Sequence, residues 1–361
     1  MRVGIITQAL LNNYGGILQN YALQQVLKRM EHDVITIDYV SHFSLKKYII
    51  YTLKTFFLLF CNRRRKFLSY FRKRNFYNQQ FVNQYINTTY PTKRYSLKII
   101  KDYNLDALVV GSDQVWRPEY NNDLYDMYLS FACNREHLIR IAYAASFGLD
   151  KWNYTRKQTT QCTSLAKKFD AISVREFSGI ELCKNNLDVH AVQVLDPTLL
   201  IGKEKYEELC KDVPVENTSF LAAYILDLNK EKEEFIYKIG KENNFPIKIF
   251  RADNNASFSI QEWLAVFRDA KYVITDSFHG TLFSIIFRKD FITIGNKKRG
   301  LSRFYSVLSD LHLKDRLVVN FTSTSHVISP IEWGKVESSL NDKIEDSYRF
   351  LKNSLNVEFN N

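Results

Sequence analysis

A histidine stands where a predicted buried strand gives way to a helix. The strand Tyr272–Thr275 is followed by the run DSFHGT at 276–281 and then by an apolar helical stretch. Asp276 or Ser277 can cap this helix, which places His279 in its first turn, where free N–H groups and the positive end of the helix dipole face a ligand. Imidazole exchanges protons near neutral pH. We therefore predict that His279 is a general acid or base, although a lone histidine is more often structural.

Positively charged side chains follow two other predicted strands. Arg175 comes directly after Ala171–Val174, and a guanidinium can bind a carboxylate or phosphate through two parallel hydrogen bonds. The alternative is a surface helix that starts with a local pair between Arg175 and Glu176. A basic loop, Gly295–Phe304, follows the strand Phe291–Ile294 and carries Lys297, Lys298, Arg299 and Arg303. We predict that it binds phosphate or carboxylate; a solvated basic loop is the alternative.

Glycine and amide groups mark a further strand end. The strand Val3–Thr7 leads to Asn13-Tyr14-Gly15-Gly16 and then into a helix. The glycine pair lets backbone N–H groups approach an anion at the helix N-terminus, and a tight turn between strand and helix is the alternative. The run is not the GxGxxG pattern of dinucleotide-binding folds.

A carboxylate, an amide and an indole follow the strand Ala107–Val110. They are Asp113, Gln114 and Trp116 in the run GSDQVW at 111–116. Together they suit a sugar subsite, or an acid close to the chemistry, whereas a helix cap is the alternative for Asp113. The pair Asp196-Pro197, after another strand, is interpreted first as a turn, and a functional role for Asp196 is the alternative.

Parallel strands would bring these strand ends together. Short β-branched strands alternate with helices such as Gly16–Met30 and Thr155–Phe169, which is typical of a parallel sheet covered on both faces. One set of strands precedes the polar segment 202–216 and a second set follows it. We predict an α/β chain with two doubly wound, Rossmann-like domains that face a central cleft, where ligands bind beyond the carboxyl ends of the strands.

The predicted domain boundaries follow from this alternation. The first domain covers residues 1–200 and contains a basic amphipathic insertion at 43–84. The second domain covers 201–330. A long amphipathic helix in 331–361 is expected to cross back to the first domain.

The net charge of +11 is concentrated in residues 43–76, which hold ten lysines and arginines and no acidic residue. The apolar stretch 48–61 has 14 residues, fewer than the roughly 20 that a spanning helix needs. We predict that this segment lies on the anionic inner face of the cell membrane. A surface helix packed on the first domain is the alternative. Nucleic acid is not an expected partner, because no nucleic-acid-binding motif accompanies the basic residues.

Cysteine use and the N-terminal pattern suggest a cytoplasmic protein. The chain opens on a strand pattern rather than a signal peptide, and its five cysteines are dispersed. No two cysteines or histidines have the spacing of zinc ligands. We therefore expect reduced thiols and no metal site.

Six motifs, taken together and in order, resemble the polysaccharide pyruvyltransferase family over nearly the whole chain. They are NYGGILQNYALQ at 13–24, GSDQVW at 111–116, SVRE at 173–176, LDPT at 195–198, DSFHGT at 276–281 and KKRGLSRF at 297–304. The resemblance implies a GT-B-like fold. It also implies transfer of the enolpyruvyl unit of phosphoenolpyruvate to two hydroxyls of a sugar, which releases phosphate and forms a cyclic pyruvate ketal in bacterial capsular or exopolysaccharide synthesis, without a cofactor.

The resemblance also implies roles for individual residues. His279 matches the family's histidine, and Arg175 matches its mid-chain arginine. Many members carry Arg-Leu before the histidine, whereas Ser277-Phe278 stands here, so another cation must hold the donor. We assign catalysis to His279, with Asp113 as the alternative proton carrier. Donor binding is assigned to Arg175, Ser277, Lys297, Arg299, Arg303, Gly15 and Gly16, and acceptor binding to Asn13, Tyr14, Gln114 and Trp116.

Two other functions are compatible with the same sequence. One is a glycosyltransferase of this fold that uses a nucleotide sugar as its donor. The other is a non-catalytic, membrane-associated scaffold of polysaccharide assembly. The expected acceptor of the pyruvyltransferase is a sugar linked to polyprenyl diphosphate at the membrane.

Overall fold

The computed structural model describes residues 1–11, 13–39, 76–121, 123–251, 258–296, 299–319 and 329–356. The basic segment predicted to bind a membrane therefore lies outside the described residues, apart from its last position, and so does Lys297. Residues 76–85 are helical. They include the part of the predicted insertion, 76–84, that the structure describes.

The first sheet is parallel and, within the described ranges, has the strand order β2-β1-β3-β4-β5-β6. All four residues of β3 are buried, because helices cover both faces of the sheet and leave β3 no solvated side. The strands are β1 (Arg2–Ile6), β2 (Asp33–Thr36), β3 (Ala107–Val110), β4 (Ile139–Ala145), β5 (Ala171–Val174) and β6 (Val192–Gln193). The helices around them are α1 (Tyr14–Arg29), α4 (Leu97–Asp102), α5 (Arg156–Ala166) and α6 (Phe177–Leu182).

The second sheet is also parallel, and its described strands follow the order β11-β10-β9-β7-β8. The strands are β7 (Leu221–Ile225), β8 (Ile247–Arg251), β9 (Tyr272–Thr275), β10 (Asp290–Ile294) and β11 (Leu317–Val318). The helices are α8 (Lys230–Glu242), α9 (Ile260–Asp269), α10 (Phe278–Ile286) and α11 (Ser302–Asp310). β11 was not predicted from the sequence, because a strand of two residues is too short to show a periodic pattern.

The segment expected to link the domains is in part a packed helix. Within 202–216, α7 (Lys203–Leu209) buries Tyr206, whose ring meets Phe283 of α10 edge to face at 4.9 Å. The aromatic ring stabilises this segment against the second domain, which is why it does not behave as a free linker.

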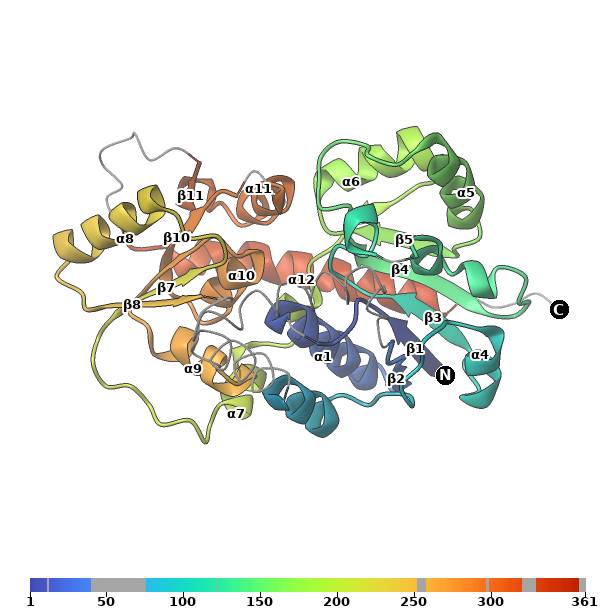
Figure 1. Cartoon of the computed structure of the whole chain (residues 1–361), viewed down its shortest axis with the longest axis horizontal. Coiled ribbons are helices and arrows are strands. Elements are labelled where there is room, and N and C mark those ends of the chain that lie inside the picture. The colour runs from blue at the N-terminus through green and yellow to red at the C-terminus, as the bar shows by residue number, and fades with distance from the viewer. Residues whose placement is uncertain are drawn as a thin grey trace, which may run out of the picture.

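The last helix, α12 (Trp333–Leu355), runs behind both sheets (Figure 1). Arg288, just after α10, pairs with Glu337 near the start of α12 at 2.7 Å. Further along, Ser347 Oγ accepts a hydrogen bond from the Leu195 N–H at 3.0 Å, and Leu351 is buried in the core that contains Tyr143 of β4. This helix therefore contacts both sheets through its two ends.

The two domains also touch on the side of α6 and α11. The Phe177 N–H donates to Ser306 Oγ at 3.0 Å. Gly148 and Gly300 face each other so closely that a Cβ at Gly300 would overlap the Gly148 carbonyl. Both glycines have left-handed φ values, 75° and 90°, which residues other than glycine rarely adopt.

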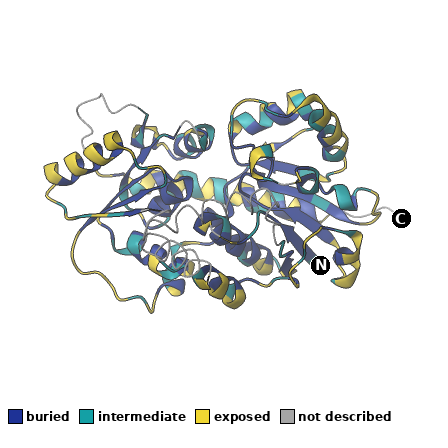
Figure 2. Cartoon of the chain, viewed as in Figure 1, coloured by how far each residue is buried: buried dark blue, intermediate teal, exposed yellow. Residues whose placement is uncertain are grey.

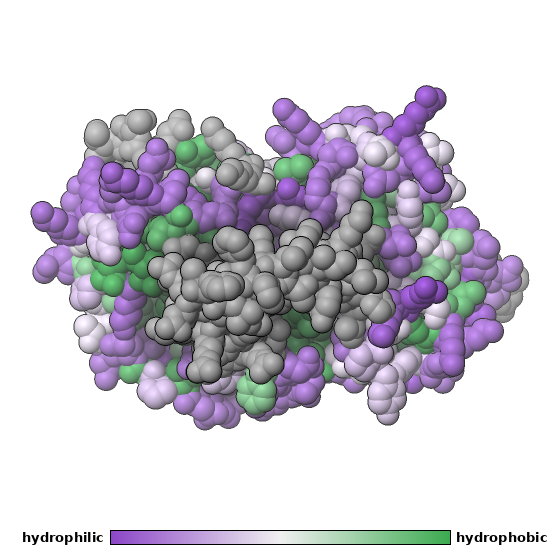
Figure 3. All heavy atoms as spheres, in the orientation of Figure 1, coloured by the Kyte–Doolittle hydropathy of each residue, from purple (hydrophilic) through white to green (hydrophobic). Residues whose placement is uncertain are grey.

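Burial follows the layers of the fold. Figure 2 shows buried strands enclosed by helices whose outer faces are exposed. Hydrophilic side chains cover α8 at one end of the molecule and α5 and α6 at the other (Figure 3). Within the described ranges, no helix combines the length and the apolar composition needed to cross a bilayer.

Candidate active site

A cavity of about 290 Å³ lies between the two domains. The first turn of α1 reaches it from one domain, and the first turn of α10 reaches it from the other. Both helices start after the carboxyl end of a parallel strand, which is where ligands bind in such sheets. The predicted site residues on the wall are Asn13, Tyr14, Gly15, Asp113, Gln114, Ser277, His279, Arg299 and Arg303.

His279 is positioned by the start of α10. Ser277 Oγ accepts a hydrogen bond from the Gly280 N–H at 3.2 Å and caps the helix. The imidazole of His279 is 7% exposed and packs on Gly15 of α1, where a Cβ would overlap Nδ1. Gly15 therefore lets the two helix N-termini approach each other, which is a use of this glycine beyond the anion contact predicted from the sequence.

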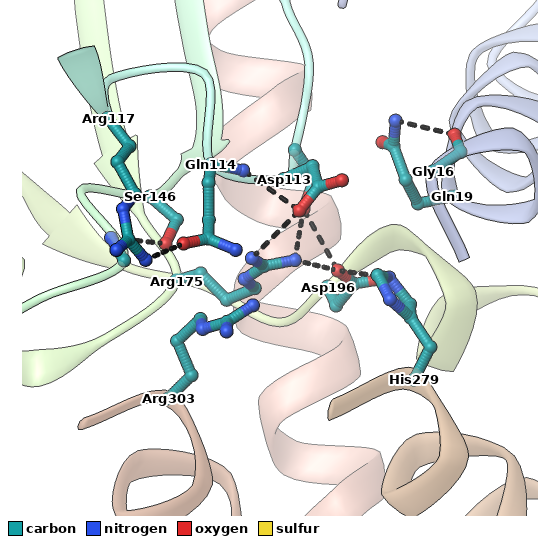
Figure 4. A network of polar contacts seen from close by, with 12 residues as sticks. Gly16, Gln19, Asp113, Gln114, Arg117, Ser146, Arg175, Asp196, His279 and Arg303 are labelled. Carbon is teal, nitrogen blue, oxygen red and sulfur yellow. Dashed lines mark hydrogen bonds and ion pairs between the residues drawn. The ribbon is translucent and has the colours of Figure 1, made fainter. Parts of the chain in front are cut away.

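Asp196 is the carboxylate beneath the histidine. Its Oδ2 lies 3.7 Å from His279 Nε2, longer than a direct hydrogen bond but within the range of an ion pair (Figure 4). The same oxygen accepts hydrogen bonds from Arg175 at 2.7 Å and from Ser112 Oγ at 2.9 Å. Burial alone would raise the pKa of Asp196, but His279, Arg175 and the Thr198 N–H outweigh burial and hold this pKa well below its usual range. Asp196 is therefore ionised.

Arg175 joins the two carboxylates of the site. Its Nη1 bonds Asp196, and its Nη2 lies 3.6 Å from Asp113 Oδ1. Burial alone would lower the pKa of the guanidinium, but Asp196, Asp113 and Glu176 outweigh burial and raise the pKa of Arg175. With a side chain 2% exposed, Arg175 lies beneath the cavity rather than on its wall, so its charge acts on a ligand from below.

Asp113 lies on the cavity wall in a strained backbone conformation. Its φ is 84°, a left-handed value that costs energy for a residue with a side chain. Oδ1 accepts the N–H of Gln114 at 2.9 Å, and Oδ2 accepts Asn13 Nδ2 at 3.0 Å. These bonds hold the carboxylate between α1 and Arg175, and Asp113 is not a helix cap, because the next helical turn begins at Pro118.

Two arginines of the second domain reach the cavity with different partners. Arg299 donates from Nε and Nη2 to the two carboxylate oxygens of Asp227, at 2.6 and 3.0 Å. Arg303 instead donates to the Arg299 carbonyl at 3.0 Å, and its Nε has no hydrogen-bond partner among the described residues. Burial, followed by the charge of Arg175, lowers the pKa of Arg303 to about 10, so it remains a cation at neutral pH.

Phe278 contacts both buried arginines. The guanidinium of Arg175 lies 4.5 Å from the centre of its ring, and that of Arg303 lies 5.1 Å from it. The negative face of an aromatic ring attracts a cation, so Phe278 helps to keep two like charges in one site.

The structure corrects two predictions about the strand ends. Trp116 is fully buried, stacks on Tyr128 at 4.9 Å, and donates from Nε1 to the Met127 carbonyl at 3.1 Å. It belongs to the core of the first domain and cannot contact an acceptor. Gly16 lies outside the cavity wall, and its carbonyl accepts a hydrogen bond from Gln19 at 3.0 Å (Figure 4).

Other residues of the site were not predicted. Asp196 was interpreted as a turn, although its place after a strand was a usable signal. Asp276, considered only as a cap, is fully buried and pairs with Lys232 at 2.5 Å. Glu176, considered only as a local partner of Arg175, is buried, and its Oε1 accepts a hydrogen bond from Ser146 Oγ at 2.9 Å. Burial raises its pKa.

Two solved structures illustrate the architecture that this chain shares. The N-terminal domain of trehalose-6-phosphate phosphatase from Candida albicans is 13% identical, with a TM-score of 0.54 over 98% of each chain. A UDP-GlcNAc 2-epimerase from Methanocaldococcus jannaschii is 12% identical, with a TM-score of 0.52 over 99% of this chain and 100% of that one. These likenesses concern the fold alone. They confirm the predicted fold class of two doubly wound, Rossmann-like domains in a GT-B-like arrangement.

Sequence comparison gives one family. A search of curated proteins finds no match. The family model described as polysaccharide pyruvyl transferase matches residues 13–298, a range that includes the walls of the cavity from Asn13 to His279.

Proposed function

The chain belongs to the polysaccharide pyruvyl transferase family and is a transferase of polysaccharide synthesis; on this premise we propose that its donor is phosphoenolpyruvate and that its acceptor is a sugar with two reactive hydroxyls. A proton adds to the methylene carbon of the donor, and the first hydroxyl attacks C2. The C2–O bond to phosphate breaks, and the second hydroxyl attacks C2. Two hydroxyl protons are released; one balances the new methyl group and the other leaves with phosphate.

The pairing of His279 with ionised Asp196 is the observation that carries this proposal. A carboxylate beside Nε2 favours the tautomer with the proton on that nitrogen. Nδ1, which adjoins Gly15 on the cavity wall, is then the nitrogen that takes a proton from a hydroxyl or returns it. Asp113 is the second candidate for proton transfer, because it also lies on the wall. Positioned acid–base groups of this kind contribute about 10²–10⁴ in rate.

Positive groups on the cavity wall and beneath the cavity can balance the negative charge of the donor. Arg303 lies on the wall with its Nε free of hydrogen-bond partners among the described residues, and the N-termini of α1 and α10 point their N–H groups at the same cavity. Arg175 adds a positive charge beneath them. We assign to these groups the role that an arginine two positions before the histidine would otherwise have, and we assign no cofactor to the reaction.

We also propose a place for the reaction. The ten basic residues within 43–76 can attract an anionic bilayer by about 1 kcal/mol each, which suits a sugar on polyprenyl diphosphate at the cytoplasmic leaflet. This proposal rests on sequence, since the segment lies outside the described residues. Replacing Phe56–Leu59 by serine and Arg63–Arg65 by glutamine should release the protein from anionic liposomes in co-sedimentation. Wild-type protein that stays in the supernatant at low salt would contradict it.

Donor choice tests the proposed reaction. The purified chain is incubated with phosphoenolpyruvate carrying ¹³C at C3 and with a panel of sugar glycosides, and phosphate release is measured together with the NMR signal of a ketal methyl group. We expect both signals with at least one glycoside. Consumption of a nucleotide sugar without turnover of phosphoenolpyruvate would instead assign the chain a glycosyltransferase activity.

A further inference from the structure

A second cavity of about 260 Å³ adjoins the first. Gln8 and Tyr120 line both, so the two spaces share one wall. The described residues on the wall of the second cavity all lie between Thr7 and Met127 in the first domain, and among them are Tyr39, Tyr95, Asp123 and Asp126. None of the residues to which a role was assigned from the sequence lies on this wall.

Aromatic rings form one part of this second cavity. Tyr39 stacks on Tyr95 with ring centres 5.0 Å apart, and Tyr95 stacks on Phe131 at 5.4 Å. Tyr120, 45% exposed, carries the guanidinium of Arg117 over its ring at 4.4 Å. The stack fixes the rings of Tyr39 and Tyr95 before any ligand arrives, and a preorganised ring costs little entropy when it binds.

Carboxylates form the other part, and no lysine or arginine is among the described residues of the lining. Asp126 accepts a hydrogen bond from Ser130 Oγ through Oδ1 at 3.0 Å. Asp123 accepts the N–H of Tyr125 through Oδ1 at 3.0 Å. Because a carboxylate has about four acceptor sites, both residues retain capacity for the hydroxyls of a ligand. Apolar rings with a few directed acceptors suit the two faces of a sugar ring.

The two cavities differ in the sign of their charge. The catalytic cavity holds Arg303 and Arg299 on its wall, whereas Asp123 and Asp126 are the charged groups among the described residues of the second cavity. Like charges placed together are strongly disfavoured. An anionic donor is therefore directed to the first cavity, and the second favours a ligand without negative charge.

We propose that the second cavity is the subsite for an uncharged pyranose ring of the acceptor, with Tyr120 at the passage to the catalytic cavity and with Asp123 and Asp126 excluding acidic sugars. The inference rests on the proposed function, because it presumes a sugar acceptor. Beyond that function, the proposal specifies the kind of sugar ring that the acceptor presents and the residues that select this ring.

Matched acceptors test the selection. The KM values of a neutral hexoside and of the hexuronide with the same stereochemistry are compared in the wild type and in Asp123→Asn/Asp126→Asn. We expect a wild-type KM about tenfold higher for the hexuronide, and a ratio close to one in the double variant, because like-charge repulsion is removed. Asp150→Asn, which removes an exposed carboxylate outside both cavities, should keep the wild-type ratio.

A second variant tests the passage. Tyr120→Ala should raise the KM for the neutral acceptor about tenfold, as expected for a lost ring contact of about 1.4 kcal/mol, and should leave the KM for phosphoenolpyruvate within about twofold. The subsite would be overturned if the double variant kept the wild-type ratio of the KM for the hexuronide to the KM for the neutral hexoside, and if Tyr120→Ala kept the wild-type KM for the acceptor. The transfer reaction would be unaffected by that result.

Direct binding separates the two proposals. Saturation-transfer NMR with the neutral hexoside needs no turnover and is applied to the wild type, Tyr120→Ala and the double variant. Hexoside binding that weakens in the variants supports the subsite even if no phosphate is released from phosphoenolpyruvate. Binding equal in all three proteins contradicts it.

Discussion

Asp196 of the first domain places its Oδ2 3.7 Å from Nε2 of His279 in the second domain. The carboxylate is held from the other side by Arg175 at 2.7 Å, so the proposed proton-transfer group of the second domain faces a fixed ion pair of the first. The pairing exists only when the domains are docked, and the active site is therefore a property of the interface.

Replacing both partners of this pair should show that they act as one unit. His279→Gln should lower turnover by about 10²–10⁴, the contribution of an acid–base group. Asp196→Asn should lower turnover less, because the imidazole is kept and loses only the carboxylate that orients it. The double variant should be no slower than His279→Gln alone, since the carboxylate acts through the histidine.

Circular dichroism and thermal unfolding provide the control for this cycle, since each variant must be folded to be compared. Effects of the two substitutions that multiply in the double variant would show that Asp196 acts independently of His279.

The two arginines on the wall should differ in their effect on donor binding. Arg303→Ala should raise the KM for phosphoenolpyruvate by about 10–100-fold, in line with about 1.5–3 kcal/mol for a hydrogen bond to a charged group. Arg299→Ala should raise it less, because Asp227 already occupies that guanidinium. Steady-state kinetics at saturating acceptor measure the difference, and Arg303→Lys should recover part of the loss. The opposite ranking would place the donor at Arg299.

A methyl group at Gly15 should separate the two helix N-termini. Gly15→Ala puts a Cβ into the His279 ring, so we expect a loss of turnover of about tenfold or more, as small displacements at a reacting centre produce. Gly16→Ala is the milder comparison, because the atom nearest to its Cβ is Asn13 Nδ2, at 3.0 Å, and not the imidazole. Equal activity of the two variants would show that the contact with Gly15 does not position the imidazole.

Burial raises the pKa of Asp126 from 3.8 to about 6, which gives stability a pH dependence. A carboxyl group whose pKa is raised by folding stabilises the folded state while it is protonated, and this contribution is lost as pH rises from about 4 to about 6. The wild type should therefore lose more of its free energy of unfolding over this interval than Asp126→Asn does. Urea unfolding at several pH values measures the difference, and parallel curves would contradict the assignment to Asp126.

Local sequence signals predicted the parts of the site that local structure determines. His279 follows a buried strand and a capping serine within eight residues, so its position can be derived from the sequence alone. Asp196 meets His279 only when α10 of the other domain approaches, and no local sequence pattern predicts that contact. Trp116 was assigned to the site because it lies next to Asp113 and Gln114 in sequence. Whether a residue reaches the site depends instead on where its side chain points, and the Trp116 side chain packs against Tyr128 in the core.

The contact between Gly148 and Gly300 has a consequence for mutational tolerance. Both residues lie in loops, where sequence usually drifts freely, and neither carries a group that could react. Any side chain at Gly300 nevertheless meets the Gly148 carbonyl, and both backbones are left-handed. A scan of all single substitutions should therefore find two intolerant loop positions. A side chain at Gly300 should push the two domains apart, and compensation should come from a change in the opposing loop, whereas a side chain at Gly148 would meet Gln114 of its own domain.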